Sequence, residues 1–258
     1  MPDGTARAII RASRILAREA QALRFSPPVE YVYNPLLYAR EPFERYIERY
    51  ASGPRRVLLL GMNPGPWGMT QPGVPFGEVS TVREWLSVDG TVGQPDRPHP
   101  RVAVTGFSCR RSEVSGRRLW GLLREHYVSA AEMSRDLFVG NYCPLMFLDG
   151  AGKNVTPDRI AAPDRAPLYA LCDRFLLVIV KSLQPRWVTG VGRFAARRAE
   201  EALASAPVSA ARPGADVRVA TLPHPSPANP AANRDWAGQA GRVLREQGIW
   251  EGQGGGNP

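Results

Sequence analysis

The chain has 258 residues and a formal net charge of +9, from 33 Lys and Arg against 24 Asp and Glu. Three cysteines, Cys109, Cys143 and Cys172, are too few and too scattered for a disulfide framework, and their spacing fits neither a zinc ribbon nor an iron–sulfur pattern. No run of 18 apolar residues could cross a membrane, and residues 1–4 do not start a secretion signal. These features predict a cytosolic protein with reduced thiols.

The excess of positive charge favours a polyanionic partner, because neutralising phosphates releases counterions and drives affinity for nucleic acids. Lys153 and Lys181 are the two lysines of the sequence, so 31 of the 33 basic residues are arginines. A GC-rich genome would explain arginine in place of lysine. It would not explain the excess of positive over negative charge, and we therefore expect nucleic acid binding.

Apolar residues spaced three and four apart predict an amphipathic helix over residues 5–23, followed by a proline-punctuated extended segment over 25–33. Further helices are predicted over residues 41–50, 82–86, 115–127, 166–183, 193–204 and 229–248. At the start of the last one, Asn229 suits the N-cap and Pro230 the first helical position. Unbroken apolar runs predict buried strands at residues 57–60, 136–141, 187–190 and 217–222.

Strands that alternate with helices predict a three-layer α/β/α fold, with a central, mostly parallel four-stranded sheet flanked by helices. We expect one domain over residues 1–250, with an N-terminal accessory helix, and a disordered glycine-rich tail at 251–258. Each predicted strand has a polar or glycine residue at or just after its carboxyl end, namely Asn63, Asn141, Gly190 and His224. Since ligands collect beyond the carboxyl ends of parallel strands, these residues indicate a shared site.

The loop from Gly61 to Met69 is rich in glycine and proline, which fix tight turns and let backbone N–H groups approach a ligand. It matches neither a Walker loop nor a dinucleotide fingerprint, and an ordinary rigid turn is the alternative. Prolines on both sides hold His224, which could donate a hydrogen bond to a leaving group that gains negative charge. A purely structural histidine is the alternative.

Asn141 could pair with the edge of a nucleobase, because an amide is both donor and acceptor, or it could simply cap a strand end. Phe76 could stack on a base or belong to the core. The stretch 109–118 places four arginines and two serines at a predicted helix start. Such a stretch suits a phosphate site, although a solvated charged face is equally compatible with it.

Five motifs carry a resemblance to a known family. They are Gly-Met-Asn-Pro-Gly-Pro-Trp-Gly-Met at 61–69, Gly-Val-Pro-Phe-Gly-Glu-Val at 73–79, Ser-Glu-Val-Ser-Gly at 112–116, Asn-Tyr-Cys-Pro-Leu at 141–145 and His-Pro-Ser-Pro at 224–227. In this order they resemble the single-strand-selective monofunctional uracil-DNA glycosylases, from about Tyr31 to Trp250. The resemblance implies a DNA repair enzyme that hydrolyses the N-glycosidic bond of uracil, and of 5-hydroxymethyluracil-type bases, in single- and double-stranded DNA.

The resemblance also implies roles for particular residues. Asn63 would position the attacking water, and His224 would stabilise the uracil anion at O2. Asn141 would read the uracil edge and Phe76 would stack on the ring, while the pocket beside C5 would be lined by Met62, Gly65 and Met69. The DNA wedge and backbone contacts would come from Pro225, Ser226, Pro227, Ala228, Arg110, Arg111, Ser115 and Arg117.

The residue types agree with a monofunctional hydrolase. Asn63 cannot take a proton at neutral pH, so the reaction should be dissociative, with an anionic leaving base. Neither catalytic motif holds a lysine, so we expect no Schiff-base lyase step, and an abasic site should remain. We expect neither metal nor cofactor, and a monomer that acts on the nucleoid in a bacterial cytoplasm.

Two positions depart from the family pattern: Ala228 stands where arginine is frequent, and Trp67 where phenylalanine is common. Ala228 would be a weaker plug for the gap in the duplex, and Trp67 a bulkier neighbour for the mouth of the pocket. Two other functions remain open at this point. One is a shifted specificity for hypoxanthine or xanthine, and the other is a catalytically weak protein that binds damaged DNA.

Overall fold

The computed structural model describes residues 3–206, 217–230 and 232–251. The strands are β1 (Tyr31–Tyr33), β2 (Val57–Gly61), β3 (Leu137–Asn141), β4 (Met146–Leu148), β5 (Trp187–Val191) and β6 (Arg218–Leu222). The α-helices are α1 (Gly4–Ala22), α2 (Pro35–Tyr38), α3 (Arg40–Tyr50), α4 (Val79–Glu84), α5 (Val114–His126), α6 (Ala130–Asp136), α7 (Ala162–Leu183), α8 (Arg193–Ala204) and α9 (Ala232–Glu246). Short 3₁₀ turns lie at Gly106–Ser108 and Pro157–Arg159.

The central sheet has four parallel strands in the order β3-β2-β5-β6, which confirms the predicted sheet. Every residue of β2, β3 and β5 is buried, as expected for parallel strands covered on both faces. Gly61 pairs with Asn141, and Val191 pairs with Leu222. The register therefore brings the carboxyl ends of all four strands to one edge.

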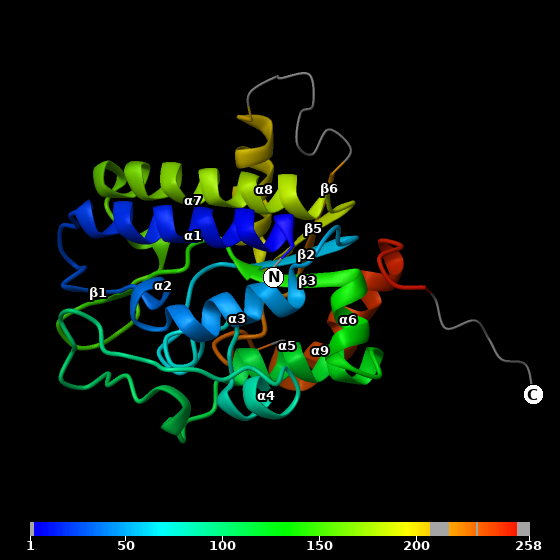
Figure 1. Cartoon of the computed structure of the whole chain (residues 1–258), viewed down its shortest axis with the longest axis horizontal. Helices are drawn as coiled ribbons and strands as arrows, with labels where there is room; N and C mark the ends of the chain where they lie inside the picture. The colour runs from blue at the N-terminus through cyan, green and yellow to red at the C-terminus, as the bar shows by residue number, and fades with distance from the viewer. Residues whose placement is uncertain (1–2, 207–216, 231, 252–258) are drawn as a thin grey trace, which may run out of the picture.

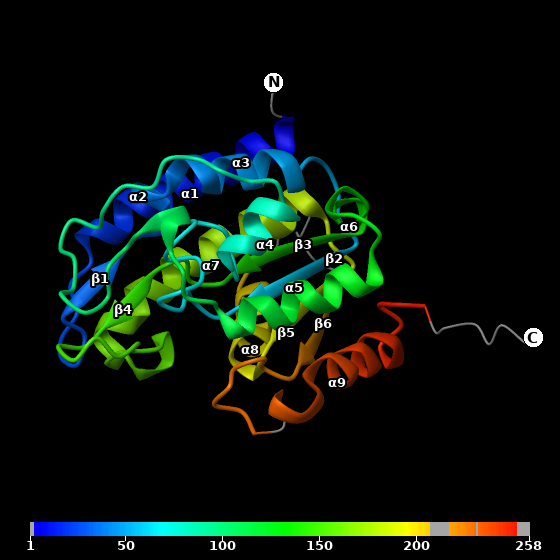
Figure 2. The ribbon, with the colours of Figure 1, turned by 90° about the horizontal axis from the view of Figure 1, so that it is seen from below.

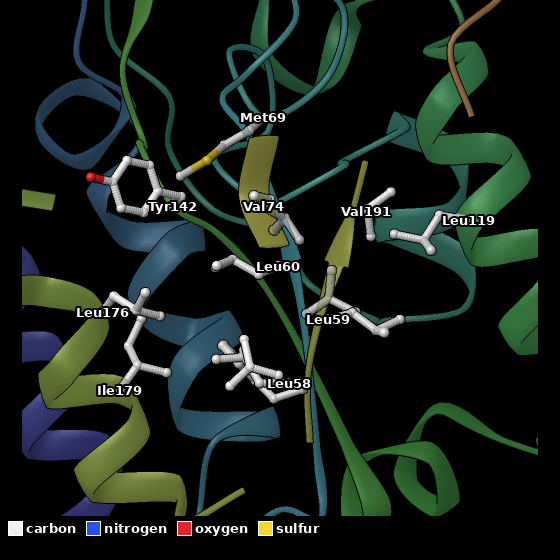
Figure 3. Close-up of a cluster of buried hydrophobic side chains, with 14 of the residues drawn as sticks. Leu58, Leu59, Leu60, Met69, Val74, Leu119, Tyr142, Leu176, Ile179 and Val191 are labelled. Atoms are coloured by element: carbon white, nitrogen blue, oxygen red, sulfur yellow. The ribbon is translucent and has the colours of Figure 1, made fainter. Parts of the chain in front are cut away.

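Helices cover both faces of this sheet. Helices α1 and α7 lie side by side on one face, while α5 and α9 lie on the other (Figures 1 and 2). Figure 3 shows Leu58 of β2 pointing toward Leu176 and Ile179 of α7, whereas Leu59 points to the opposite side, where Leu119 of α5 lies. This alternation along one strand joins both helical layers to the sheet, and the three-layer α/β/α prediction is confirmed.

A second, antiparallel sheet of two strands was not predicted. Strand β1 pairs with β4, with Tyr31 opposite Leu148. Helices α2 and α6 were not predicted either. Because α6 continues to Asp136, the predicted strand start at that residue is wrong, and Asp136 instead accepts hydrogen bonds from Arg56 Nε (2.7 Å) and the Tyr127 hydroxyl (2.6 Å).

The predicted start of the last helix is also wrong. Helix α9 begins at Ala232, and the Asn229 amide donates to the carbonyl of His224 at 3.2 Å. Helix α7 starts at Ala162, four residues before the predicted start, because Pro163 fits a first helical turn. Helix α4 starts at Val79, since the Glu78 carboxylate caps it by accepting the N–H of Thr81 at 3.1 Å.

Apart from Glu251, the predicted disordered tail lies outside the described residues. Within the described part of the chain, no helix combines the length and apolar character needed to cross a membrane.

Candidate active site

A cavity of about 490 Å³ lies where the loops after β2, β4 and β6 meet the end of β3 and the start of α5. Most of the residues predicted from the sequence line it: Met62, Asn63, Gly65, Met69, Phe76, Ser115, Asn141, His224, Ser226 and Pro227. Five of the residues predicted to contact DNA do not line this cavity: Pro225, Ala228, Arg110, Arg111 and Arg117. The structure therefore brings the proposed catalytic and base-binding residues together and leaves most of the proposed DNA contacts around them.

Gly61, the last residue of β2, lets two of these side chains converge. A Cβ atom at this position would lie 2.5 Å from both Asn141 Oδ1 and Phe76 Cε2. No real side chain tolerates such distances, so only glycine allows the amide and the ring to meet over the end of the strand. The pair forms one wall of the cavity.

Asn141 is buried, and its Nδ2 lies 3.5 Å from the sulfur of Met69. Thioether sulfur is a weak acceptor, so this contact orients the amide without satisfying it. A buried amide with unused hydrogen-bonding capacity favours a ligand with complementary donors and acceptors.

The backbone of Phe76 adopts a left-handed conformation, with φ of 54°. Its carbonyl accepts a hydrogen bond from Trp120 Nε1 at 3.1 Å. Gly116 of α5 leaves room for this carbonyl, because a Cβ there would lie 2.0 Å from the Phe76 oxygen. Helix α5 therefore holds the ring of Phe76 in place from behind.

Asn63 lies in the loop after β2, and one of the two polar atoms of its side chain is hydrogen-bonded within the protein. Its Nδ2 donates to the carbonyls of Leu145 (3.3 Å) and Pro64 (3.4 Å), which leaves Oδ1 as the acceptor available to a ligand. The sequence did not indicate Gln71, which supports this loop: its Nε2 donates to the carbonyl of Pro66 at 2.9 Å, and its Oε1 accepts from the N–H of Thr105 at 2.9 Å.

The His224 ring has a defined tautomer. Its Nδ1 accepts the N–H of Ser226 at 3.1 Å, so the neutral ring carries its proton on Nε2. Burial lowers the pKa of His224, which favours this neutral form. The ring lies against Gly192, whose φ is +96° and where a Cβ would come within 3.0 Å of His224 Cδ2. His224 is thus a neutral N–H donor at the cavity.

The loop that carries His224 is fixed to both neighbouring helices. Arg118 of α5 donates from Nη1 to the carbonyl of Pro225 at 2.7 Å and from Nη2 to Oδ1 of Asn233 at 3.0 Å. Asn233 of α9 in turn donates to the carbonyl of Pro227 at 2.9 Å. Arg118 lies in the basic stretch that the sequence singled out, but its role here is to hold the loop.

The remaining proposed DNA-contacting residues differ in exposure. Arg110, Arg117 and Ala228 are exposed, whereas Pro225 is buried. Arg111 is also exposed, and its guanidinium carbon lies 4.3 Å from the centre of the Trp67 ring. This cation–π contact joins the basic stretch to the lining of the cavity.

Glu113, Asn154 and Thr156 also line the cavity, although the sequence assigned them no role. Glu113 caps α5 by accepting the N–H of Ser115 at 3.2 Å, and burial raises the pKa of its carboxyl. Because Glu113 belongs to the Ser-Glu-Val-Ser-Gly motif, three residues before Gly116, the sequence could have indicated that it lies at the site. Asn154 and Thr156 lie in a loop whose sequence has no periodic pattern, so no signal pointed to them.

Behind Asn141, the neighbouring Tyr142 belongs to a buried polar network. Its hydroxyl donates to Asp173 at 2.7 Å and accepts from Nε of Arg198 at 2.9 Å, and burial raises its pKa. Arg198 also binds both carboxylate oxygens of Asp173, at 2.8 and 2.7 Å. The network ties the end of β3 to α7 and α8.

No group of three or more His, Cys, Asp or Glu residues in the described ranges comes together in a way that could hold a metal ion. The residues that line the cavity offer amide, imidazole, aromatic, hydroxyl and carboxyl groups.

Several known proteins are similar to this chain. The sequence model of the uracil DNA glycosylase superfamily matches residues 49–242. The chain is 44% identical to the single-strand selective monofunctional uracil DNA glycosylase of Bos taurus over 248 residues, which cover 96% of this chain and 89% of that protein. It is 45% identical to the Rattus norvegicus protein of the same name over 234 residues, covering 91% and 82% of the two chains.

Among solved structures, wild-type SMUG2 of Pedobacter heparinus superposes with a TM-score of 0.62 at 14% identity, covering 92% of this chain and 97% of that one. At this identity the likeness concerns the fold alone. The family match and the close relatives go further: this chain belongs to the uracil-DNA glycosylase superfamily and, within it, to the single-strand-selective monofunctional uracil-DNA glycosylases.

Proposed function

We propose that this protein is a monofunctional DNA glycosylase that hydrolyses the N-glycosidic bond of uracil in DNA and leaves an abasic site. The observation that carries the proposal is the convergence of Asn63, Asn141 and a neutral His224 on one cavity, in a chain that belongs to this family. A nucleotide must leave the base stack to enter such a cavity, so the enzyme acts by base flipping.

In the proposed complex, the flipped uracil stacks on Phe76 and pairs through N3–H and O4 with the amide of Asn141. The Nε2–H of His224 then donates to O2. As the C1′–N1 bond breaks, the bonding electrons leave with the base, and negative charge develops on that oxygen. A donor fixed before the reaction in a site with little water stabilises this charge by several kcal/mol.

On the sugar side, Asn63 orients the water that attacks C1′ through its free Oδ1. An amide does not accept a proton at neutral pH, so Asn63 cannot act as a general base. The reaction then depends on departure of the base ahead of attack by water, with an oxocarbenium-like sugar. This division of labour assigns charge stabilisation to His224 and water orientation to Asn63.

The wider substrate range is part of the same proposal. Met62, Gly65 and Met69 would lie beside C5 and admit 5-hydroxymethyluracil-type bases, in single- and double-stranded DNA. The tip of the His224 loop, from Ser226 to Ala228, would fill the space left by the flipped nucleotide. The enzyme would act as a monomer in a bacterial cytoplasm, and neither a shifted specificity for hypoxanthine or xanthine nor a purely DNA-binding role is favoured by the comparisons.

The test is cleavage of a uracil-containing oligonucleotide, read as strand scission after alkali. We expect the wild-type protein to generate abasic sites. Replacing Asn63 by Ala should slow single-turnover cleavage about 100-fold or more, because misplaced water costs that much, while DNA binding changes little. No scission by the wild-type protein at any enzyme concentration would refute the function, and full activity of the Asn63→Ala variant would refute the role of the residue.

A further inference from the structure

We propose that Glu113 is a specificity-determining residue, whose carboxyl accepts a hydrogen bond from a donor group on C5 of the flipped base, such as the hydroxyl of 5-hydroxymethyluracil. This role rests on the proposed glycosylase function and adds a side chain to the C5 side of the cavity. Glu113 is the N-cap of α5 and lines the same cavity as Asn141 and His224.

One carboxyl oxygen of Glu113 is free to bind a ligand. Oε1 caps α5 by accepting the N–H of Ser115 at 3.2 Å, whereas Oε2 has no donor among the described residues. Oε2 is not sealed inside the protein, because none of the fully buried, unpartnered side-chain oxygen and nitrogen atoms in the described ranges belongs to Glu113. It is therefore an accessible acceptor in a half-buried side chain.

This free oxygen faces two glycines of the loop after β2. A Cβ atom at Gly65 would lie 2.8 Å from Glu113 Oε2, and a Cβ atom at Gly68 would lie 3.2 Å from it. Both glycines line the cavity. Because neither has a side chain, neither covers the oxygen, and Glu113 borders the space that a larger residue at Gly65 would fill.

The amide of Asn141 determines which part of the base faces this loop. In the proposed complex, Asn141 Oδ1 accepts N3–H and Nδ2 donates to O4, while His224 binds O2. Asn141 Nδ2 is also the atom that lies 3.5 Å from the sulfur of Met69, the last residue of the loop. O4 therefore lies on the Met69 side. Since C5 is next to C4 and opposite C2 in the ring, it is turned away from His224 and toward the loop of Gly65 and Gly68.

A carboxyl on this side distinguishes pyrimidines by their C5 group. The hydroxyl of 5-hydroxymethyluracil can donate to Oε2, whereas uracil has only a hydrogen on C5 and cannot make this bond. The carboxyl accepts in both its ionised and its neutral form. Burial raises the pKa of Glu113, which favours the neutral form and reduces repulsion of the anion that leaves.

The experiment compares single-turnover cleavage of 5-hydroxymethyluracil and of uracil, in otherwise identical single-stranded oligonucleotides, by the full-length protein. Glu113→Ala should lower the ratio of the two rates, 5-hydroxymethyluracil over uracil, about 10-fold, the effect of one lost hydrogen bond to a carboxyl. The ratio removes effects of the substitution that are common to both bases. Glu113→Ser keeps a side chain that can cap α5 but is too short to reach Gly65, so it should lower the ratio equally with a smaller loss of stability.

Glu78→Ala is the matched control. Glu78 caps α4 as Glu113 caps α5, by accepting the N–H of Thr81 at 3.1 Å, but it does not line the cavity. Its replacement therefore removes a glutamate cap without removing an acceptor from the site. This variant should lose thermal stability and keep the wild-type ratio of the two rates.

Three results would overturn the role of Glu113: an unchanged or higher ratio in Glu113→Ala, an equal fall of the ratio in Glu78→Ala, or a wild-type ratio in Glu113→Ser. A wild-type protein that cleaves uracil but not 5-hydroxymethyluracil would also contradict it. If the wild-type protein cleaves neither base, the proposed function itself is wrong, which is a different result.

Discussion

Phe76 holds a backbone conformation that a residue with a large side chain seldom adopts, at a cost of about 1–3 kcal/mol. The hydrogen bond from Trp120 and the absence of a side chain at Gly116 keep it there. This conformation brings the ring next to the Asn141 amide over Gly61. At the scale of residues, the site is therefore organised before it binds a substrate.

His224 gives a testable pH dependence of stability. Burial lowers its pKa in the folded protein below the ordinary value of 6.5, so the unfolded chain takes up a proton first as the pH falls. The stabilisation is complete above pH 6.5 and is lost as the pH falls toward the folded pKa. Thermal melts between pH 7.5 and 5 should show a larger loss of Tm for the wild type than for His224→Gln.

His126 serves as the internal control for this experiment. Its pKa is also lowered by burial, but it is present in both proteins, so its contribution cancels in the difference. Parallel Tm curves for the two proteins across this range would mean that His224 is not buried in the neutral form.

At the scale of elements, the sequence predicted those parts that depend on local patterns. Strands β2 and β5 are continuous apolar runs because both faces of the sheet are covered. Strands β1 and β4 span three residues each, too few for a periodic signal. The predicted start of α9 is wrong because Asn229 uses its side chain in a hydrogen bond to the carbonyl of His224, five residues earlier in the same loop.

The site residues divide in the same way, into those that local sequence patterns predict and those that depend on contacts in the folded chain. Asn63, Asn141 and His224 could be found because each lies at or just after the carboxyl end of a strand, a position that the sequence reveals. Asn154 could not, because its loop reaches the cavity only through pairing with β4. Gln71 donates to the carbonyl of Ala103 and Arg118 to that of Pro225, both in distant loops, and such contacts exist only in the folded chain.

Arg118 connects two helices to the loop of His224, and its removal should impair catalysis more than folding. Arg118→Ala frees the carbonyl of Pro225 and Oδ1 of Asn233, which should cost about 1–3 kcal/mol of stability. His224 is part of this loop, so releasing the loop should misplace its ring. We therefore expect single-turnover cleavage to fall about 10- to 100-fold at a temperature well below the Tm.

Asn233→Ala provides the matched comparison. It removes the contact to Pro227 and one partner of Arg118, so the losses of the two single variants should not add in the double variant. Fully additive losses would mean that the two side chains act separately and do not form one clamp on the loop.

At the scale of the whole molecule, one hydrophobic core joins the layers. This core includes Ile9 and Leu16 of α1, Leu58 of β2 and Leu244 of α9, so the N-terminal helix packs into the same core as the sheet. Helix α1 and the start of α5 lie on opposite sides of the sheet (Figure 1). Both helices carry arginines, so the net charge of +9 does not by itself identify the arginines that contact DNA.

Salt dependence can identify them. For single-stranded DNA, the slope of log K against log salt is about −0.7 for each phosphate that the protein neutralises. Replacing Arg110 or Arg117 by Ala should therefore reduce the magnitude of the slope by about 0.7 each, since both are exposed beside the cavity at the start of α5. Arg11→Ala, on the exposed face of α1 across the sheet, removes the same charge and should leave the slope unchanged. Equal changes in all three variants, measured by titration from about 50 to 200 mM salt, would show that DNA responds to the total charge of the protein and not to a defined contact surface.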